Sequence, residues 1–161
     1  MLSWRPWWLT CPLAACRCVQ QLDASNTANA SLAGLAALLM PGVSGQAAET
    51  LCRGAAEVAV QLRGMVKQPR EQQDVAHAGS SVLQLFLTSV AELGGGRACC
   101  LSEVRLDGCS WAGDAALVLL AAACEELSCV SVRGCKGVSS IGAHCLAWAR
   151  GHVASLPRLL C

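Results

Sequence analysis

Cysteine and histidine are the residues whose types could support chemistry in this chain. Twelve cysteines and three histidines occur among its 161 residues. His144 and Cys145 have the side chains of a thiol–imidazole nucleophile, but neighbouring residues on a helix point about 100° apart and do not face each other. No cysteine pair has the CxxC spacing of a structural zinc site, and no phosphate-binding or nucleophile motif is present. The sequence therefore predicts no catalytic residue, no metal site and no cofactor.

Three of the cysteines instead end a repeated segment. The segments are LSEVRLDGC at 101–109, LSCVSVRGC at 127–135 and a decayed VASLPRLLC at 153–161, so these cysteines recur with a 26-residue period. A fixed period of this length is typical of stacked supersecondary units. At an apolar position of such a unit a free thiol behaves as a small buried hydrophobe, which favours a reducing compartment.

Each 26-residue block predicts one strand and one helix. Residues 104–106 alternate apolar and polar side chains, as a strand buried on one face does. Residues 108–109 mark a turn, and 114–124 have the length and the Ala/Leu content of a short helix. Because the same order recurs over 130–150, we expect the two strands to pair in parallel.

These blocks resemble the cysteine-containing leucine-rich repeats of F-box receptors and of ribonuclease-inhibitor-like proteins. In that family a unit reads LxxLxLxxC and continues into a helix with an Ala/Leu/Cys pattern. In the third block Arg158 falls on a core position, so that unit is expected to be degenerate or shifted in frame. The match covers residues 97–161, and its repeat-core positions are Leu101, Val104, Leu106, Cys109, Cys124, Leu127, Val130, Val132 and Cys135.

The resemblance implies a fold and a function. The implied fold class is α/β, a short leucine-rich-repeat solenoid of 26-residue strand-turn-helix units preceded by an α-helical segment. Relatives with such repeats are substrate-recognition subunits of SCF-type ubiquitin ligases, in which an F-box docks an adaptor and the repeats hold the substrate. Residues 28–95 contain neither the Leu-Pro start nor the closing Trp segment of an F-box. The implied function is a non-enzymatic protein–protein interaction module, with a substrate protein and an SCF adaptor as candidate partners.

The alternation of the strands also predicts which side chains face a partner. Residues between the core positions point to the opposite face of the sheet. Arg105 and Arg133 are the expected anchors, because arginine is enriched at interface hot spots. The full set of candidate partner-binding residues is Glu103, Arg105, Asp107, Cys129, Ser131 and Arg133.

Three helices are expected upstream of the repeats. Apolar residues fill 30–40, follow spacings of four and three along 46–66, and mark one face of 81–93. The polar stretch 67–74 is the expected linker. So few repeats predict that further units or a partner chain contribute to stability. The predicted division is 1–27, a disordered or targeting segment; 28–96, a helical cap or helical repeat; and 97–161, cysteine-type repeats that are incomplete at the C-terminus.

Charge and hydropathy limit the classes of partner that we expect this chain to bind. Lys plus Arg is 12 and Asp plus Glu is 11, and the basic residues are scattered, so no nucleic-acid partner is expected. No run approaches the ~20 apolar residues of a membrane span. The free thiols predict a cytoplasmic or nuclear location, with an N-terminal targeting segment left open.

Two alternatives stay open at this point. Helices separated by the breaker pair at 41–42 also suit an armadillo- or HEAT-like scaffold, in which strands at 104–106 and 130–132 would be absent. The segment LAAC at 13–16 is similar to the lipobox of an exported lipoprotein, although Pro12 interrupts a short apolar stretch.

Overall fold

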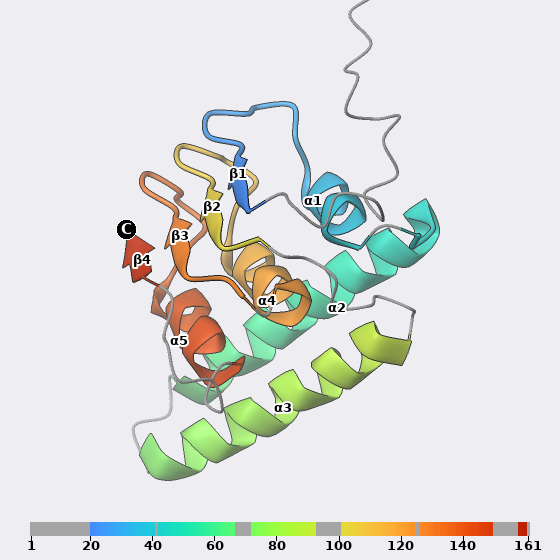
Figure 1. Cartoon of the computed structure of the whole chain (residues 1–161). Helices are drawn as coiled ribbons and strands as arrows, with labels where there is room; N and C mark the ends of the chain where they lie inside the picture. The colour runs from blue at the N-terminus through green and yellow to red at the C-terminus, as the bar shows by residue number, and fades with distance from the viewer. Residues whose placement is uncertain are drawn as a thin grey trace, which may run out of the picture.

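A computed structural model describes residues 20–40, 42–66, 72–92, 101–124, 126–149 and 158–160. Within these ranges the chain forms short strands and helices of very different lengths (Figure 1). The elements in chain order are β1 (Gln21–Asp23), α1 (Leu32–Leu39), α2 (Gly45–Val66), α3 (Gln72–Glu92), β2 (Glu103–Arg105), α4 (Asp114–Ala123), β3 (Cys129–Ser131), α5 (Ser140–Ala149) and β4 (Arg158–Leu160).

The four strands form one parallel sheet in the order β1-β2-β3-β4. Its central row aligns Leu22, Val104, Val130 and Leu159. The predicted parallel pairing of the two repeat strands is confirmed, because Val104 pairs with Val130, its equivalent in the next repeat block. These strands are not compatible with an all-helical armadillo- or HEAT-like scaffold.

Helices cover one face of the sheet in two layers (Figure 1). α1, α4 and α5 lie side by side behind the strands, and α2 and α3 pack across them on the outside. No element among the described residues covers the opposite face of the sheet. The described residues therefore form three layers, and they leave one face of the sheet open.

The predicted leucine-rich-repeat solenoid is wrong as the fold class. The helices α1, α2 and α3 do not form a separate segment ahead of the sheet; they lie between β1 and β2, which pair directly across this long insertion. The sequence separation between paired strand residues also departs from the repeat period at the β4 edge of the sheet. There Val130 pairs with Leu159 rather than with the residue one repeat period later. The described residues form a small layered α/β fold of five helices and one four-stranded sheet, not a uniform stack of 26-residue units.

The structure also places several segment boundaries at other residues than the sequence predicted. α3 begins at Gln72, so the end of the expected linker 67–74 is helical, and 67–71 lie outside the described residues. β1 falls within the segment 1–27, of which residues 1–19 lie outside the described ranges. The change of frame at β4 places Arg158 beside Cys129 rather than at the equivalent of Leu106, while Cys161 lies outside the described residues.

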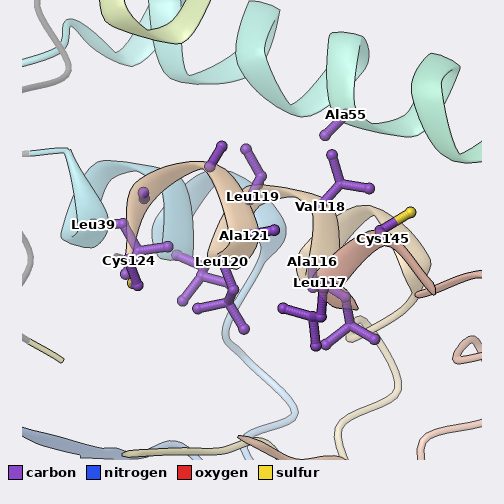
Figure 2. Packing of buried hydrophobic residues seen from close by; sticks show 14 of the residues in the cluster. Leu39, Ala55, Ala116, Leu117, Val118, Leu119, Leu120, Ala121, Cys124 and Cys145 are labelled. Carbon is purple, nitrogen blue, oxygen red and sulfur yellow. The ribbon is translucent and has the colours of Figure 1, made fainter. Parts of the chain in front are cut away.

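The apolar surface of helix α4 explains why a second layer of helices is present. Apart from Asp114 it is apolar on every side, so covering only one of its faces would leave aliphatic side chains in water. Residues 116–123 are all buried. In Figure 2, Val118 points toward α2, where Ala55 faces it, while Leu117 points away from α2. The inner helix layer is therefore enclosed by both the sheet and the outer helices.

The apolar stripes on α2 and α3 allow these two helices to cover the inner helix layer. Along each helix the buried residues recur at spacings of three and four, which places them on one face. A Cβ added at Gly54 would come within 3.2 Å of the Phe86 Cε2 atom, so this glycine allows α2 and α3 to approach closely. The buried apolar residues are Ala48, Leu51, Ala55, Val58, Ala59 and Leu62 on α2, and Leu83, Phe86 and Val90 on α3.

The turns after the first three strands stack on one another. Asn26, Gly108 and Gly134 hold equivalent positions with left-handed φ angles of 58°, 71° and 71°. The Asn26 N–H donates to the Asp107 carbonyl at 2.7 Å, and the Gly108 N–H donates to the Arg133 carbonyl at 2.8 Å. Glycine adopts positive φ at little cost, which accounts for its presence in two of the three turns.

Cysteine thiols link each turn to the one before it. The Cys109 thiol donates to the Ala24 carbonyl at 3.0 Å, and the Cys135 thiol donates to the Leu106 carbonyl at 2.9 Å. Burial raises the pKa of Cys135, which keeps its thiol protonated as a donor at neutral pH. Cys109 and Cys135 are therefore buried structural groups.

Gly108→Ala should destabilise the fold. A Cβ at this left-handed position would lie 2.3 Å from the Asn26 Oδ1 atom, and an L-residue with positive φ costs about 1–2 kcal/mol before that clash is relieved. Gly64→Ala is the control, because a Cβ on this α2 residue meets nothing within 4 Å and alanine favours helix. Urea denaturation should show a lower free energy of unfolding for G108A and an equal or higher one for G64A. Equal stability of the two variants would contradict the stacked turns.

Val130→Asp should prevent cooperative folding. Val130 is fully buried in the central row of the sheet, and an unpaired carboxylate there costs several kcal/mol, comparable to the whole stability of a small domain. Thermal melting followed by circular dichroism should lose its transition in V130D. It should persist in the control Val60→Asp, because Val60 on α2 is 66% exposed. An unchanged V130D melting curve would show that the sheet core is not formed as described.

Candidate functional site: the open face of the sheet

All nine predicted repeat-core residues are buried. Their side chains lie on the side of the sheet and turns that the inner helices cover, so the residues that alternate with them in the strands lie on the open face. None of these nine residues is more than 8% exposed, and they are Leu101, Val104, Leu106, Cys109, Cys124, Leu127, Val130, Val132 and Cys135.

The six candidate partner-binding residues lie along β2, β3 and the turns that follow them. They differ in exposure, and one of them is removed from contact with solvent. In chain order they are Glu103 (half-buried), Arg105 (exposed), Asp107 (half-buried), Cys129 (half-buried), Ser131 (buried) and Arg133 (exposed).

The burial of Ser131 corrects the expectation that it faces a partner. Only 4% of Ser131 is exposed, and its hydroxyl donates to the Asp107 Oδ1 atom at 2.6 Å. The same Oδ1 atom accepts the Arg133 N–H at 2.7 Å. Asp107 and Ser131 therefore hold neighbouring strands together.

The two predicted anchors have different environments. The Arg105 guanidinium pairs with the Glu103 Oε1 atom at 2.6 Å through one terminal nitrogen and at 2.7 Å through Nε. This hydrogen bond raises the pKa of Arg105, and the two opposite charges partly cancel at the surface. For the Arg133 guanidinium, the described part of the chain supplies no ion pair. Arg133 is exposed and is thus available to pair with an anionic group of a partner.

Strand β1 adds two exposed residues that the sequence analysis missed. Gln21 pairs with Glu103 and Asp23 pairs with Arg105, so both occupy register positions on the open face. Hydrogen bonds from Ser25 lower the pKa of Asp23, which keeps its carboxylate ionised. The alternating segment QLDA was the available signal, but it lies off the 26-residue step.

A surface hollow opens between these first two strands. Gln21, Leu22 and Asp23 from β1 line it together with Glu103 and Arg105 from β2. Leu22 is half-buried, and its side chain packs against the core because it lies in the same row as the buried Val104. The side chains that reach this hollow on the open face are therefore polar, and the Arg105 guanidinium lies among them with the Glu103 carboxylate.

The thiol–imidazole pair weighed from the sequence is not assembled. Cys145 is fully buried on α5, whereas His144 is exposed and its Nδ1 lies 2.6 Å from the Ser140 carbonyl oxygen. Burial raises the pKa of Cys145 to about 12. Its thiol is therefore protonated at neutral pH, which removes the nucleophilic thiolate.

Asp114 is a buried carboxylate outside the open face. Its Oδ1 accepts the Ser139 N–H and its Oδ2 accepts the Ser139 hydroxyl, both at 2.7 Å. The Arg63 guanidinium lies 2.7 Å from Oδ2 and is half exposed. Burial by itself raises the pKa of Asp114, but the bonds from Ser139 and Arg63 outweigh it, so the pKa lies below its ordinary value of 3.8. This carboxylate connects α4, the start of α5 and α2.

Comparison with known proteins does not identify this site. No protein-family model, curated protein or solved structure matches the chain. Within the described ranges, no three metal-ligating side chains gather into one group. None of the helices there combines the length and the apolar character needed to cross a bilayer.

Asp114→Asn should destabilise the protein by about 2 kcal/mol at pH 7, because it removes charge-assisted hydrogen bonds from a buried position. The pKa of Asp114 is lowered in the folded state, so its contribution is present above about pH 4 and is lost as the pH falls through the folded value. Urea denaturation across this range should therefore show the difference between wild type and D114N shrinking with acidity. Glu126→Gln, at an exposed position, is the control. A difference that does not change with pH would contradict an ionised Asp114.

Proposed function

We propose that this chain is a non-enzymatic protein-binding module whose contact surface is the open face of the parallel sheet. The observation that carries the proposal is the contrast between the two faces. One is sealed by two layers of helices, and the other carries ordered, charged side chains without a cover from any described element. A partner can therefore meet this face without any rearrangement of the core.

Ion pairs and hydrogen bonds fix several side chains on the open face, which supports a role in binding. Glu103 holds Arg105, and Asp107 accepts bonds from Ser131 and Arg133, so the neighbouring strands are joined by side chains as well as by their backbones. Fixed side chains lose little conformational freedom when a partner binds, which favours affinity. Arg133 is the proposed anchor, because arginines dominate interface energetics.

A role as the receptor subunit of an SCF-type ligase stays a prediction from the resemblance. The described residues supply no contact that identifies an adaptor, and the uniform repeat solenoid of such receptors is not found among them. The proposed function is therefore limited to protein binding in general. Recovery of an SCF adaptor with the chain would extend the proposal to ubiquitin ligation.

Arg133→Glu should abolish binding at the open face. Proteins retained by the tagged chain under reducing conditions would be quantified by mass spectrometry, with Arg53→Glu as a matched charge reversal on the exposed side of α2. R133E should reduce recovery of specific partners about tenfold or more, as expected for loss of a hot-spot arginine, while R53E retains them. Circular dichroism would verify that both variants are folded.

Two results would contradict the proposal. Failure of the folded wild-type chain to retain any protein above a tag-only control would argue against a binding module. Equal recovery by R133E and wild type would move the contact surface away from the open face.

A further inference from the structure

The backbone of strand β1 is paired on one side only. The Gln20 carbonyl accepts the Glu103 N–H at 2.9 Å, and the Ala24 N–H donates to a β2 carbonyl at 2.9 Å. Backbone groups alternate in direction along a strand, which turns the N–H and C=O groups of Gln21 and Asp23 away from β2. Within the described residues no strand pairs with this side of β1. β1 is therefore an open edge of the sheet, the kind of edge that can pair with a strand of another chain.

The helix at the same end of the fold is apolar on every side. α1 has the sequence LAGLAALL, packs on α4 and α2, and ends the row of inner helices on the β1 side (Figure 1). Residues 116–123 of α4 are all buried, whereas only three of the eight residues of α1 are. Its remaining flank, where Ala37 is exposed and Leu38 half-buried, has no cover from any described element. The inner helix layer is therefore incomplete where the sheet is also incomplete.

An occupant of this end must supply a strand and an apolar helix together. A strand alone would pair with the edge and leave the α1 flank in water, and a helix alone would cover the flank and leave the edge unpaired. The β1 end of a second copy supplies both elements, in the same layers. A two-fold contact needs one surface that fits its own copy, and this end can be tested for that property.

We infer that two copies of this chain associate through their β1 ends, with β1 pairing antiparallel to its copy and α1 packing on its copy behind the sheet. The two-fold axis is perpendicular to the sheet, so the helices of both copies lie on the same side of the joined sheet. This inference goes beyond the proposed function, because it concerns the end of the fold rather than its open face.

The edge fits its own copy in the register centred on Leu22. The outward backbone groups of Gln21 then meet those of Asp23 in the copy, as in the hydrogen-bonded pairs of antiparallel strands. On the open face, the Gln21 amide lies opposite the Asp23 carboxylate of the copy and can donate a hydrogen bond to it. On the other face, the half-buried Leu22 meets its equivalent and is covered. This register brings no like charges of β1 directly opposite each other.

Sedimentation equilibrium of the full chain in reducing buffer tests the inference. Wild type should pass from monomer to dimer between about 1 and 200 µM, because two short elements per copy form an interface at the small end of the usual range. Ala37→Glu should raise the dissociation constant of the dimer at least about tenfold, since it brings two like charges together on the α1 flank. The control Ala56→Glu, at an exposed alanine of α2, should leave the dissociation constant unchanged.

Two further measurements separate the helix contact from the strand contact. An equal mixture of Ala37→Glu and Ala37→Lys chains should associate about as tightly as wild type, because opposite charges then meet. Gln21→Pro removes an outward N–H from each copy, and proline is tolerated at the first residue of an edge strand. It should raise the dissociation constant at least about fivefold, for the loss of two backbone hydrogen bonds per dimer. Circular dichroism would verify that every variant is folded.

Several outcomes would overturn the inference. A wild-type chain that stays monomeric throughout this range would refute it, and so would a dimer that A37E leaves intact or a charge-paired mixture that does not associate. A dimer weakened by A37E but not by Q21P would place the contact on α1 alone and contradict the joined sheet. Oligomers that grow beyond the dimer would indicate a head-to-tail contact rather than a two-fold one.

Discussion

The burial of helix α4 is the constraint on which the rest of the structure depends. A helix built from alanine, leucine and valine on every side needs apolar neighbours all around it, and no single sheet can supply them. The open sheet covers its inner side, α1 and α5 flank it, and α2 covers its outer side. Because all of the cover lies behind the strands, their other face is left to polar side chains.

Local patterns in the sequence predicted the central part of this arrangement. The alternation at 104–106 and 130–132, the Gly-Cys turns and the apolar helices follow from periodicity over a few residues, and the 26-residue step relates β2 to β3 correctly. The same step predicted the wrong architecture, since it says nothing about segments outside the repeat. The all-round apolar character of DAALVLLAAA was the available signal for a second helix layer, because a repeat helix with a solvated outer side needs polar residues there.

The remaining errors of the sequence-based prediction arise from contacts between segments that the repeat period does not relate. β1 joins the sheet across the long insertion that contains α2 and α3, so Gln21 and Asp23 could not be added to the candidate site by counting repeats. β4 pairs with β3 in a register that is shifted from the 26-residue period. This register depends on backbone pairing rather than on the position of Cys161. Ser131 fits the outward pattern of its strand, yet the carboxylate of Asp107, in the turn after β2, accepts a hydrogen bond from its hydroxyl, and Ser131 is buried.

The insertion of α2 and α3 has a consequence for the order of folding. Pairing β2 with β3 closes a loop of one repeat period, whereas pairing β1 with β2 closes a loop roughly three times as long, which costs about 1 kcal/mol more in loop entropy. Because contacts of short sequence separation tend to form sooner, we expect β2 and β3 to pair first and β1 to join the sheet after the helical insertion has docked. The edge strand is then also the segment expected to open first in native-state hydrogen exchange. Completion of the open face at its β1 edge is thereby coupled to completion of the fold.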